Sequence, residues 1–189
     1  MTEASDTCRL PPIAEVHLTE AQRQARAAIM QGPRGRLSGP FVPLLRSPEL
    51  CQRTQLLGEY LRFGSVIPQR LRELAILSTA RHWRQSFEWQ THAPIAQGLG
   101  LAAGTLAALA AGLAPDALAA DEAVVLEFCH QLHTTHAVSD QTYAAARDLL
   151  GEPGVIELCG LCGYYALLAM VLNVARTPPP VGGPSPFPE

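Results

Sequence analysis

Glu88 and His92 form the pair of residues in this sequence best suited to acid–base chemistry. They lie four apart in the stretch FEWQTH (87–92), so on a helix their side chains share one face, with β-carbons about 5–6 Å apart. A carboxylate beside an imidazole fixes the tautomer of the ring and raises its basicity, which a general acid or base requires. Phe87 and Trp89 flank the acid and would lower the dielectric constant around it. The same spacing also occurs on exposed helices, where such a pair has no catalytic role.

Two cysteines, Cys159 and Cys162, have the spacing of a redox pair in the sequence CGLC. They fall inside an apolar helical stretch, away from the helix N-terminus or the cations that make a thiolate reactive. We therefore interpret both as small buried hydrophobic side chains. The alternative is a displaced peroxide-reducing pair.

Three histidines, His130, His133 and His136, have a spacing that suggests a metal site at first sight. Each three-residue step on a helix falls about 60° short of a full turn, so the first and third rings diverge by about 120°. No cysteine or aspartate nearby completes a zinc pattern. We predict a solvated helix face and no bound metal.

Two tyrosines and two arginines are further candidates for contact with a substrate. Tyr164 and Tyr165 could offer a phenol, or they could be core aromatics whose hydroxyls meet backbone carbonyls. Arg72 and Arg81 could hold an anion bidentately, or they could form ordinary surface ion pairs.

Composition excludes several classes of protein. The chain has 189 residues, 48% of them hydrophobic and 16% charged, with a net charge of −3. This favours one domain with a real core over a disordered chain, and without a basic stretch nothing supports nucleic-acid binding. All 14 basic residues are arginine, which excludes a lysine Schiff base, a pyridoxal-phosphate anchor and a Walker lysine, and we predict no cofactor.

The same composition suggests that the protein assembles with copies of itself and that it works in the cytoplasm. Charged residues are scarcer than the roughly 25% that is usual, so we expect another copy of the chain to cover part of the surface. Five cysteines in no disulfide-like pattern, and a polar N-terminus without a hydrophobic segment, predict a cytoplasmic protein.

Helix signals recur along the chain and no strand-like alternation appears, so the sequence predicts an all-α fold of about eight helices in one domain. Residues 1–17 are expected to be extended, residues 18–176 to form the helical domain, and residues 177–189 to form a proline-rich tail. This tail would either cover a neighbouring subunit or lack order. The expected helices begin with a capping box at Thr19, with Ser47 as a hydroxyl cap, and at Pro68, Gln85, Ala102, Asp121, Ser139 and Gly154.

Leu158 to Ala175 is an uncharged stretch of 18 residues, at the lower limit for a membrane-spanning helix. It contains two glycines, two tyrosines and an asparagine, and Glu157 lies directly before it. We interpret it as a buried helix of a core or a subunit interface and expect no membrane contact.

From about residue 41 to residue 176 the chain resembles the carboxymuconolactone decarboxylase family, which is related to alkylhydroperoxidase D. The resemblance is carried by Glu73 in RELAIL and by three further stretches: FEWQTHAPIAQGLGL (87–101), AVSDQTY (137–143) and GYYALLAMVLNV (163–174). It implies an all-helical domain of the alkylhydroperoxidase D type that assembles as trimers or hexamers. It also implies a pocket around the helices that carry Glu73 and His92.

One departure from the family separates two chemistries. In the peroxidase branch a Cys-x-x-Cys pair precedes the motif histidine, at positions that correspond here to Gln85 and Glu88. Neither residue can act as a thiolate nucleophile or a resolving thiol. The resemblance is therefore to the branch without this pair, and it implies His92 as the proton-transfer residue with Glu73 and Glu88 as its partners.

The sequence thus predicts a cofactor-independent, decarboxylase-like enzyme that uses His92, Glu88 and Glu73 on a small unsaturated lactone or carbonyl acid. Its expected substrate pocket is lined by Phe87, Trp89, Tyr165 and Arg72. One alternative is a peroxiredoxin-like antioxidant protein that uses Cys159 and Cys162. The other is a non-catalytic helical oligomer that binds a ligand.

Overall fold

The computed structural model describes residues 8–182 and 185–188, and within these ranges the chain is helical and contains no strand. Its α-helices are α1 (Glu20–Gln31), α2 (Phe41–Leu44), α3 (Pro48–Glu59), α4 (Gln69–His82), α5 (Ser86–Gly98), α6 (Ala103–Ala111), α7 (Ala120–Thr135) and α8 (Asp140–Ala175). A 3₁₀ turn (Glu15–His17) precedes α1, and a π-helical turn (Tyr60–Gly64) extends α3. The predicted all-α class is confirmed for the described part of the chain.

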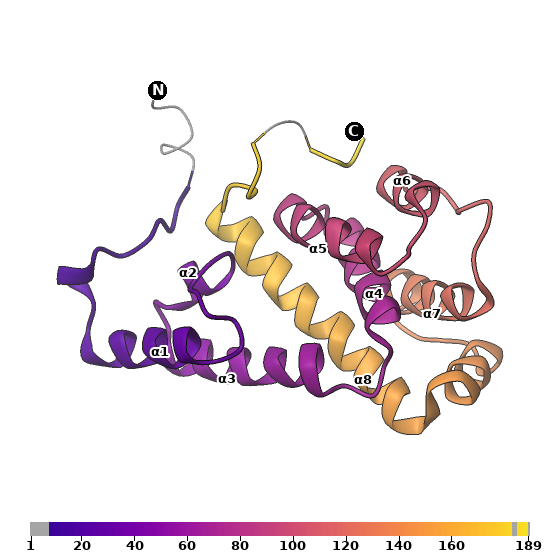
Figure 1. The fold of residues 1–189 in the computed structure, drawn as a ribbon, viewed down its shortest axis with the longest axis horizontal. Coiled ribbons are helices and arrows are strands. Elements are labelled where there is room, and N and C mark those ends of the chain that lie inside the picture. The colour runs from indigo at the N-terminus through magenta and orange to yellow at the C-terminus, as the bar shows by residue number, and fades with distance from the viewer. Residues whose placement is uncertain (1–7, 183–184, 189) are drawn as a thin grey trace.

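Helix α4 lies at the centre of the fold and packs against α5, α7 and α8 (Figure 1). Its buried residues, among them Leu71, Leu74 and Leu77, point in several directions around the helix rather than along one stripe. A helix that is apolar on most sides is buried on most sides, as α4 is. Helices α1 and α3 pack together along one flank of the molecule, while α6 lies beyond α4 on the other.

Capping side chains set several of the helix starts. The Thr19 hydroxyl accepts a hydrogen bond from the amide of Gln22, whose own side chain accepts from the Thr19 amide, so the predicted capping box is confirmed. Ser139 caps α8 in the same way through the amide of Thr142. Ser47 makes no such bond, and the prediction of a hydroxyl cap there is wrong: α3 begins with a proline at its first position instead.

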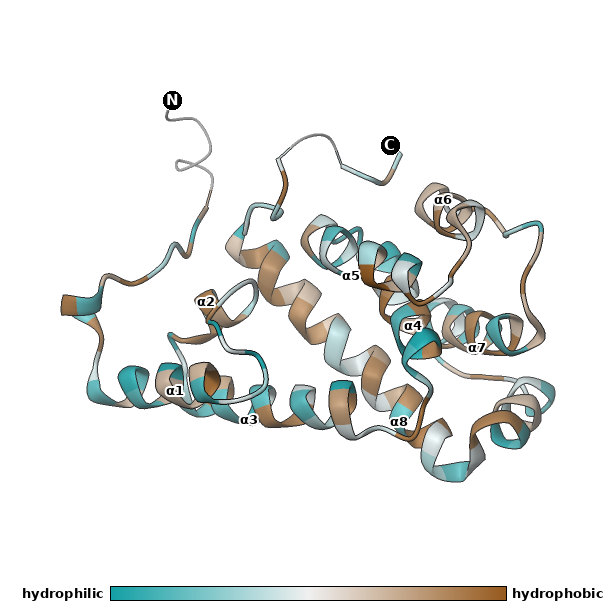
Figure 2. Cartoon of the chain, viewed as in Figure 1, coloured by the Kyte–Doolittle hydropathy of each residue, from teal (hydrophilic) through white to brown (hydrophobic). Residues whose placement is uncertain are grey.

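Helix α8 consists of two segments that meet at Gly151, where φ is +71° and ψ is 169°. The sequence predicts two helices divided at this glycine, and a residue with positive φ is what separates them. The second segment crosses the middle of the molecule and is largely apolar (Figure 2). By length and composition α8 could cross a membrane, but 56% of its most apolar window is buried inside the fold, as in a core helix.

The two ends of the chain pack against the helices. Near the N-terminus, the amide of Arg9 donates to the carbonyl of Ala175 at the end of α8. In the proline-rich tail, the amide of Val181 donates to the side chain of Gln90, and Phe187 is only 2% exposed. The described part of the tail therefore packs on its own chain, and whether it also covers a neighbouring subunit stays a prediction. Residues 1–7 of the expected N-terminal segment lie outside the described residues.

Candidate active site

Three helices bring the candidate catalytic side chains together. Glu73 comes from α4, Glu88 and His92 come from α5, and Tyr165 comes from α8. All four are buried, with exposures of 4%, 4%, 3% and 2%. The first turn of α5 presents Glu88, and His92 follows one turn later, as the sequence spacing predicts. Helix α5 continues through Pro94 to Gly98, so the proline does not end the helix.

The turn between α4 and α5 fixes the position of this group relative to α8. Gln85, at the N-cap of α5, accepts a hydrogen bond from the amide of Phe87 and donates one of 2.7 Å to Asn173 of α8. Asn173 in turn donates to the carbonyl of Trp83 at 3.2 Å. Gln85 thus links the N-terminus of α5 to α8 through its side chain.

His92 is held through one ring nitrogen and open to chemistry through the other. Its Nδ1 lies 2.6 Å from Oε2 of Glu73, so Nδ1–H donates to that carboxylate. Its Nε2 lies 3.5 Å from Oε2 of Glu88 and 3.4 Å from the hydroxyl of Tyr165. The tyrosine ring stands perpendicular to the imidazole at 5.2 Å between centroids. A neutral His92 can accept from the phenol, whereas a protonated His92 can donate its second proton toward Glu88.

The surroundings raise the pKa of His92. Burial alone would lower that pKa, but the hydrogen bonds to Glu73 and Glu88, together with the charges of both carboxylates, outweigh it. The same burial, with the charge of Glu88, raises the pKa of Tyr165 well above its ordinary value, so the phenol stays protonated. The raised pKa of His92 extends to higher pH the range over which the ring carries a proton on both nitrogens.

A cavity of about 240 Å³ opens beside His92, Glu88 and Tyr165. Three arginines also line it: Arg34 and Arg36 from the segment before α2, and Arg62 from the π-helical turn. Arg34 donates a 2.9 Å hydrogen bond to Tyr164 and lies over the ring of Phe41 at 4.3 Å. Basic side chains thus line the same cavity as a buried acid–base group, an arrangement that favours an anionic occupant.

Two buried polar atoms at this cavity have no hydrogen-bond partner among the described residues: Oε1 of Glu88 and Nε of Arg34. Buried polar groups are nearly always paired, so each such atom calls for an explanation. The free carboxylate oxygen can accept a proton or an O–H group, and the free guanidinium nitrogen can donate to an anion. Both atoms are suited to a polar ligand in the cavity.

The predicted pocket residues divide between the cavity and other places. Phe87 and Tyr165 line the cavity. Trp89 does not: it is buried in a separate apolar cluster and packs edge-to-face on Phe187 at 5.3 Å. Arg72 donates to the carbonyl of Ser65 at 3.2 Å and is also absent from the lining. Trp89 and Arg72 are thus engaged elsewhere and do not line this cavity, whereas Phe87 and Tyr165 do.

The arginines that do line the cavity carry no periodic signal in the sequence. Arg34 and Arg36 belong to the loop PRGRLSG (33–39), whose Gly35 and Gly39 both have positive φ. A β-carbon on Gly39 would lie 2.7 Å from the ring of Phe87, so glycine is required for the loop to approach α5. The only sequence feature that could have indicated these arginines as site residues is their place in a loop with turn-forming glycines.

The cysteine prediction is half right. Cys162 is buried, but Cys159 is exposed, and the partner of Cys162 is Cys129 of α7 at 3.7 Å between sulfur atoms. A hydrogen bond from the Cys129 thiol lowers the pKa of Cys162 to about 5, although burial opposes the shift; His133 adds to the lowering. All five cysteines are free thiols.

The histidines of α7 also differ from the prediction of a fully solvated face. His130 and His136 are exposed, but His133 is half-buried and stacks on His82 with 4.7 Å between ring centroids. Its Nε2 lies 3.0 Å from the hydroxyl of Thr79. Within the described ranges no group of histidine, cysteine and acidic side chains is arranged to hold a metal ion.

Comparison of the chain with protein-family models and with curated proteins finds no match. The resemblance noted in the sequence thus stays a prediction, and the geometry above carries the functional argument.

Proposed function

We propose that this protein is a cofactor-independent acid–base enzyme of the carboxymuconolactone decarboxylase type, acting on a small unsaturated lactone or carbonyl acid. One observation carries the proposal: Glu73 holds Nδ1 of His92 at 2.6 Å, while Nε2 of the same ring lies at the cavity beside Glu88. A histidine acid or base is oriented through one ring nitrogen and exchanges its proton through the other. Here Glu73 orients the ring, and Nε2 lies near Glu88 and Tyr165, which both line the cavity.

The proposed substrate binds as an anion. Its carboxylate is held by the arginines at the cavity, of which Arg34 already has an unpaired buried Nε. Its unsaturated ring lies against Phe87 and Tyr165. The cavity of about 240 Å³ is suited to a molecule of this size and not to a bulky substrate.

In the proposed step, the bond from carbon to the leaving carboxylate breaks, and its electron pair remains on the substrate as a dienolate. Carbon dioxide departs, and Nε2 of protonated His92 delivers a proton to carbon. His92 is then reprotonated from solvent, so one proton is consumed for each carbon dioxide released. Glu88 accepts and returns the proton where the substrate must first isomerise, and a positioned acid–base pair of this kind contributes about 10²–10⁴-fold to the rate.

We also propose that the enzyme works in the cytoplasm as a homo-oligomer, a trimer or hexamer as the family resemblance implies. Apolar side chains at one edge support this: Tyr60, Phe63, Val66 and Ile156 are each at least half exposed. Tyr60, Val66 and Ile156 are neighbours, because the hydroxyl of Tyr60 and the amide of Val66 both bond to Glu157, the residue after Ile156. Light scattering tests the assembly, and Ile156→Glu should lower its mass if this edge is the interface.

The experiment for the activity measures release of carbon dioxide from a panel of unsaturated lactone acids, carboxymuconolactone included. His92→Asn should lower kcat by two or more orders of magnitude, as the loss of a general acid requires. His136→Asn is the matched control, because His136 is exposed and its positive φ of 62° suits asparagine. Full turnover by His92→Asn, or none by the wild type on any member of the panel, would contradict the proposal.

A thiol peroxidase is the second candidate, favoured by the lowered pKa of Cys162. The Cys162 thiolate would attack a peroxide to give a sulfenic acid and an alcohol, Cys129 would displace water to form a disulfide, and an external thiol would reduce it. Both sulfurs are buried, which restricts access of the peroxide. Peroxide consumption no faster than that of free thiol would exclude this candidate. If neither assay gives activity, the third candidate, a non-catalytic helical oligomer that binds a ligand, is favoured.

A further inference from the structure

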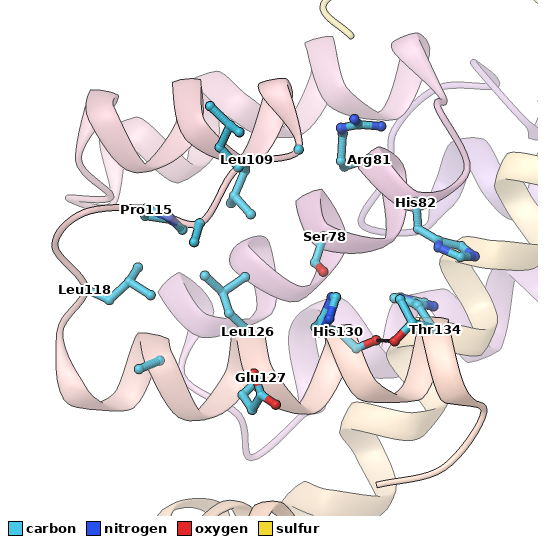
Figure 3. A pocket seen from close by; sticks show the side chains of 15 residues that line it. Ser78, Arg81, His82, Leu109, Pro115, Leu118, Leu126, Glu127, His130 and Thr134 are labelled. Carbon is cyan, nitrogen blue, oxygen red and sulfur yellow. Dashed lines mark hydrogen bonds between the residues drawn. The ribbon is translucent and has the colours of Figure 1, made fainter. Parts of the chain in front are cut away.

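We propose that a second cavity, between α4, α6 and α7, binds an amphipathic monocarboxylate: a single carboxylate on an apolar tail. The cavity measures about 590 Å³ and shares no lining residue with the one beside His92. It is formed by α4, the end of α6, the connection that follows α6, and the face of α7 (Figure 3). The proposal is independent of the activity proposed above.

One end of this cavity is apolar. Leu109, Pro115, Leu118 and Leu126 gather there, on the side of the α6–α7 connection (Figure 3). Leu113 of the same connection also lines the cavity and is 65% exposed. An apolar tail laid against these side chains would remove both surfaces from water, which is the main driving force for such binding.

The other end is polar and basic. Figure 3 shows Arg81, His82, His130 and Thr134 on the opposite side from the leucines, with Ser78 between the two ends. Arg81 has no ion-pair partner among the described residues, and its buried Nε has no hydrogen-bond acceptor there. A guanidinium with an unsatisfied buried donor is complementary to a carboxylate, which can accept two parallel bonds from it.

Two neighbours fix where the guanidinium lies. The ring of Phe187 is 5.6 Å from its central carbon. At Gly112, a β-carbon would lie 2.5 Å from Nη2 of Arg81, so glycine at this position leaves room for the side chain. Gly112 has a φ of +74° and ends α6. Glycine is therefore favoured here both by the left-handed turn and by the space that Arg81 occupies.

The other charged and titratable groups that line this cavity favour binding of an anion over binding of a cation or a metal ion. Glu127, the acid in the lining, already accepts a hydrogen bond from Gln131 at 2.7 Å. His82 and His133 are stacked with an angle of 13° between ring planes, so their nitrogens do not converge on one point. Burial, with the neighbouring histidines, lowers the pKa of His82, and a neutral imidazole can still donate one N–H to a carboxylate.

The test is calorimetric titration of the full-length protein with octanoate at neutral pH, with 1-octanol as the uncharged probe of equal length. With ten non-hydrogen atoms, octanoate should bind with a Kd of about 10–100 µM. Arg81→Gln should weaken this binding about tenfold or more, because the charge-assisted bonds are lost. Arg84→Gln, the same change at an exposed position nearby, should leave it unaltered. Arg62→Gln, in the cavity beside His92, should also leave it unaltered.

A second variant tests the same proposal independently if Arg81→Gln fails to fold. Leu113→Asp places a negative charge at the apolar end, and because Leu113 is mostly exposed the fold should tolerate it. It should also weaken octanoate about tenfold or more. Binding of octanol as tight as that of octanoate would overturn the proposal. So would the absence of saturable heat up to about 5 mM octanoate, or a loss caused by Arg62→Gln in place of Arg81→Gln.

Discussion

The bond between His92 and Glu73 can be measured through a double-mutant cycle. The two single changes are Glu73→Gln, which keeps an acceptor of the same size, and His92→Leu, which removes the ring. Free energies of unfolding from urea titrations of the wild type, both single variants and the double variant then give the coupling energy. Because glutamine still accepts from Nδ1–H, the cycle reports the charge-assisted part of the interaction.

The expected size follows from the geometry. The Nδ1–Oε2 distance is 2.6 Å and both residues are at most 4% exposed, so solvent screening is weak. A neutral hydrogen bond contributes about 1 kcal/mol and one between charged groups about 1.5–3 kcal/mol. The coupling energy should therefore be about 1–2 kcal/mol at about pH 6. Glu49 and Arg53, exposed and four apart on α3, provide the matched control pair, for which less than about 0.5 kcal/mol is expected.

The pH dependence gives the sharper test. The folded-state pKa of His92 is raised above its ordinary value of 6.5, so the protonated ring stabilises the fold. That contribution is fully present below about pH 6.5, where the unfolded chain is also protonated, and is lost as pH rises through the raised pKa. The coupling energy should decline accordingly. A coupling below about 0.5 kcal/mol at about pH 6, or one that is flat or rising up to about pH 9, would refute the assigned ion pair.

Three further predictions concern packing and access. Gly58→Ala should destabilise the protein by about 1–3 kcal/mol in thermal unfolding, since its β-carbon would lie 1.9 Å from a buried tyrosine hydroxyl. Gly163→Ala, on an open helix face, should stabilise the protein by about 0.5–1 kcal/mol. Equal changes in stability from the two substitutions would contradict the close packing at Gly58. Iodoacetamide should label Cys159 rapidly and Cys162 only as fast as the protein unfolds; rapid labelling of both, followed by mass spectrometry, would contradict the burial of Cys162. Phe187→Ala should expose the C-terminal tail to limited proteolysis and lower stability by up to about 3 kcal/mol, whereas an unchanged digest would mean that the tail does not depend on this ring.

Local signals in the sequence were sufficient for most of the helices. The capping box at Thr19 and the glycine at 151 act through neighbours a few residues away, so the sequence predicts their positions without knowledge of the packing. Helix α2 escapes prediction because its four residues are too short for a periodic pattern. The docking of the tail also escapes it, because Phe187 meets a partner ring almost a hundred residues away.

The candidate site divides in the same way. The spacing of Glu88 and His92 predicts a shared helix face, and the structure brings them to 3.5 Å. The position of Trp89 on the helix does not predict which apolar cluster its side chain joins. In the structure this side chain packs on Phe187 and does not line the cavity. The sequence could not assign Arg34 to the site either, because a loop between turn-forming glycines has no fixed direction until it packs.

The charges at the site explain why we propose an anionic ligand for a cavity that is lined by Glu88 and lies close to a second buried carboxylate, Glu73. With His92 protonated, the two carboxylates of Glu73 and Glu88 and the imidazolium, all buried and carried by α4 and α5, sum to one net negative charge. The arginines that line the cavity supply three positive charges around it. The excess is positive, so a substrate with one or two negative charges would bring the site toward neutrality, whereas a cationic substrate would increase the imbalance. In the proposed decarboxylation, loss of carbon dioxide would remove one of those negative charges from the substrate, which would weaken its hold on the arginines and favour release of the product.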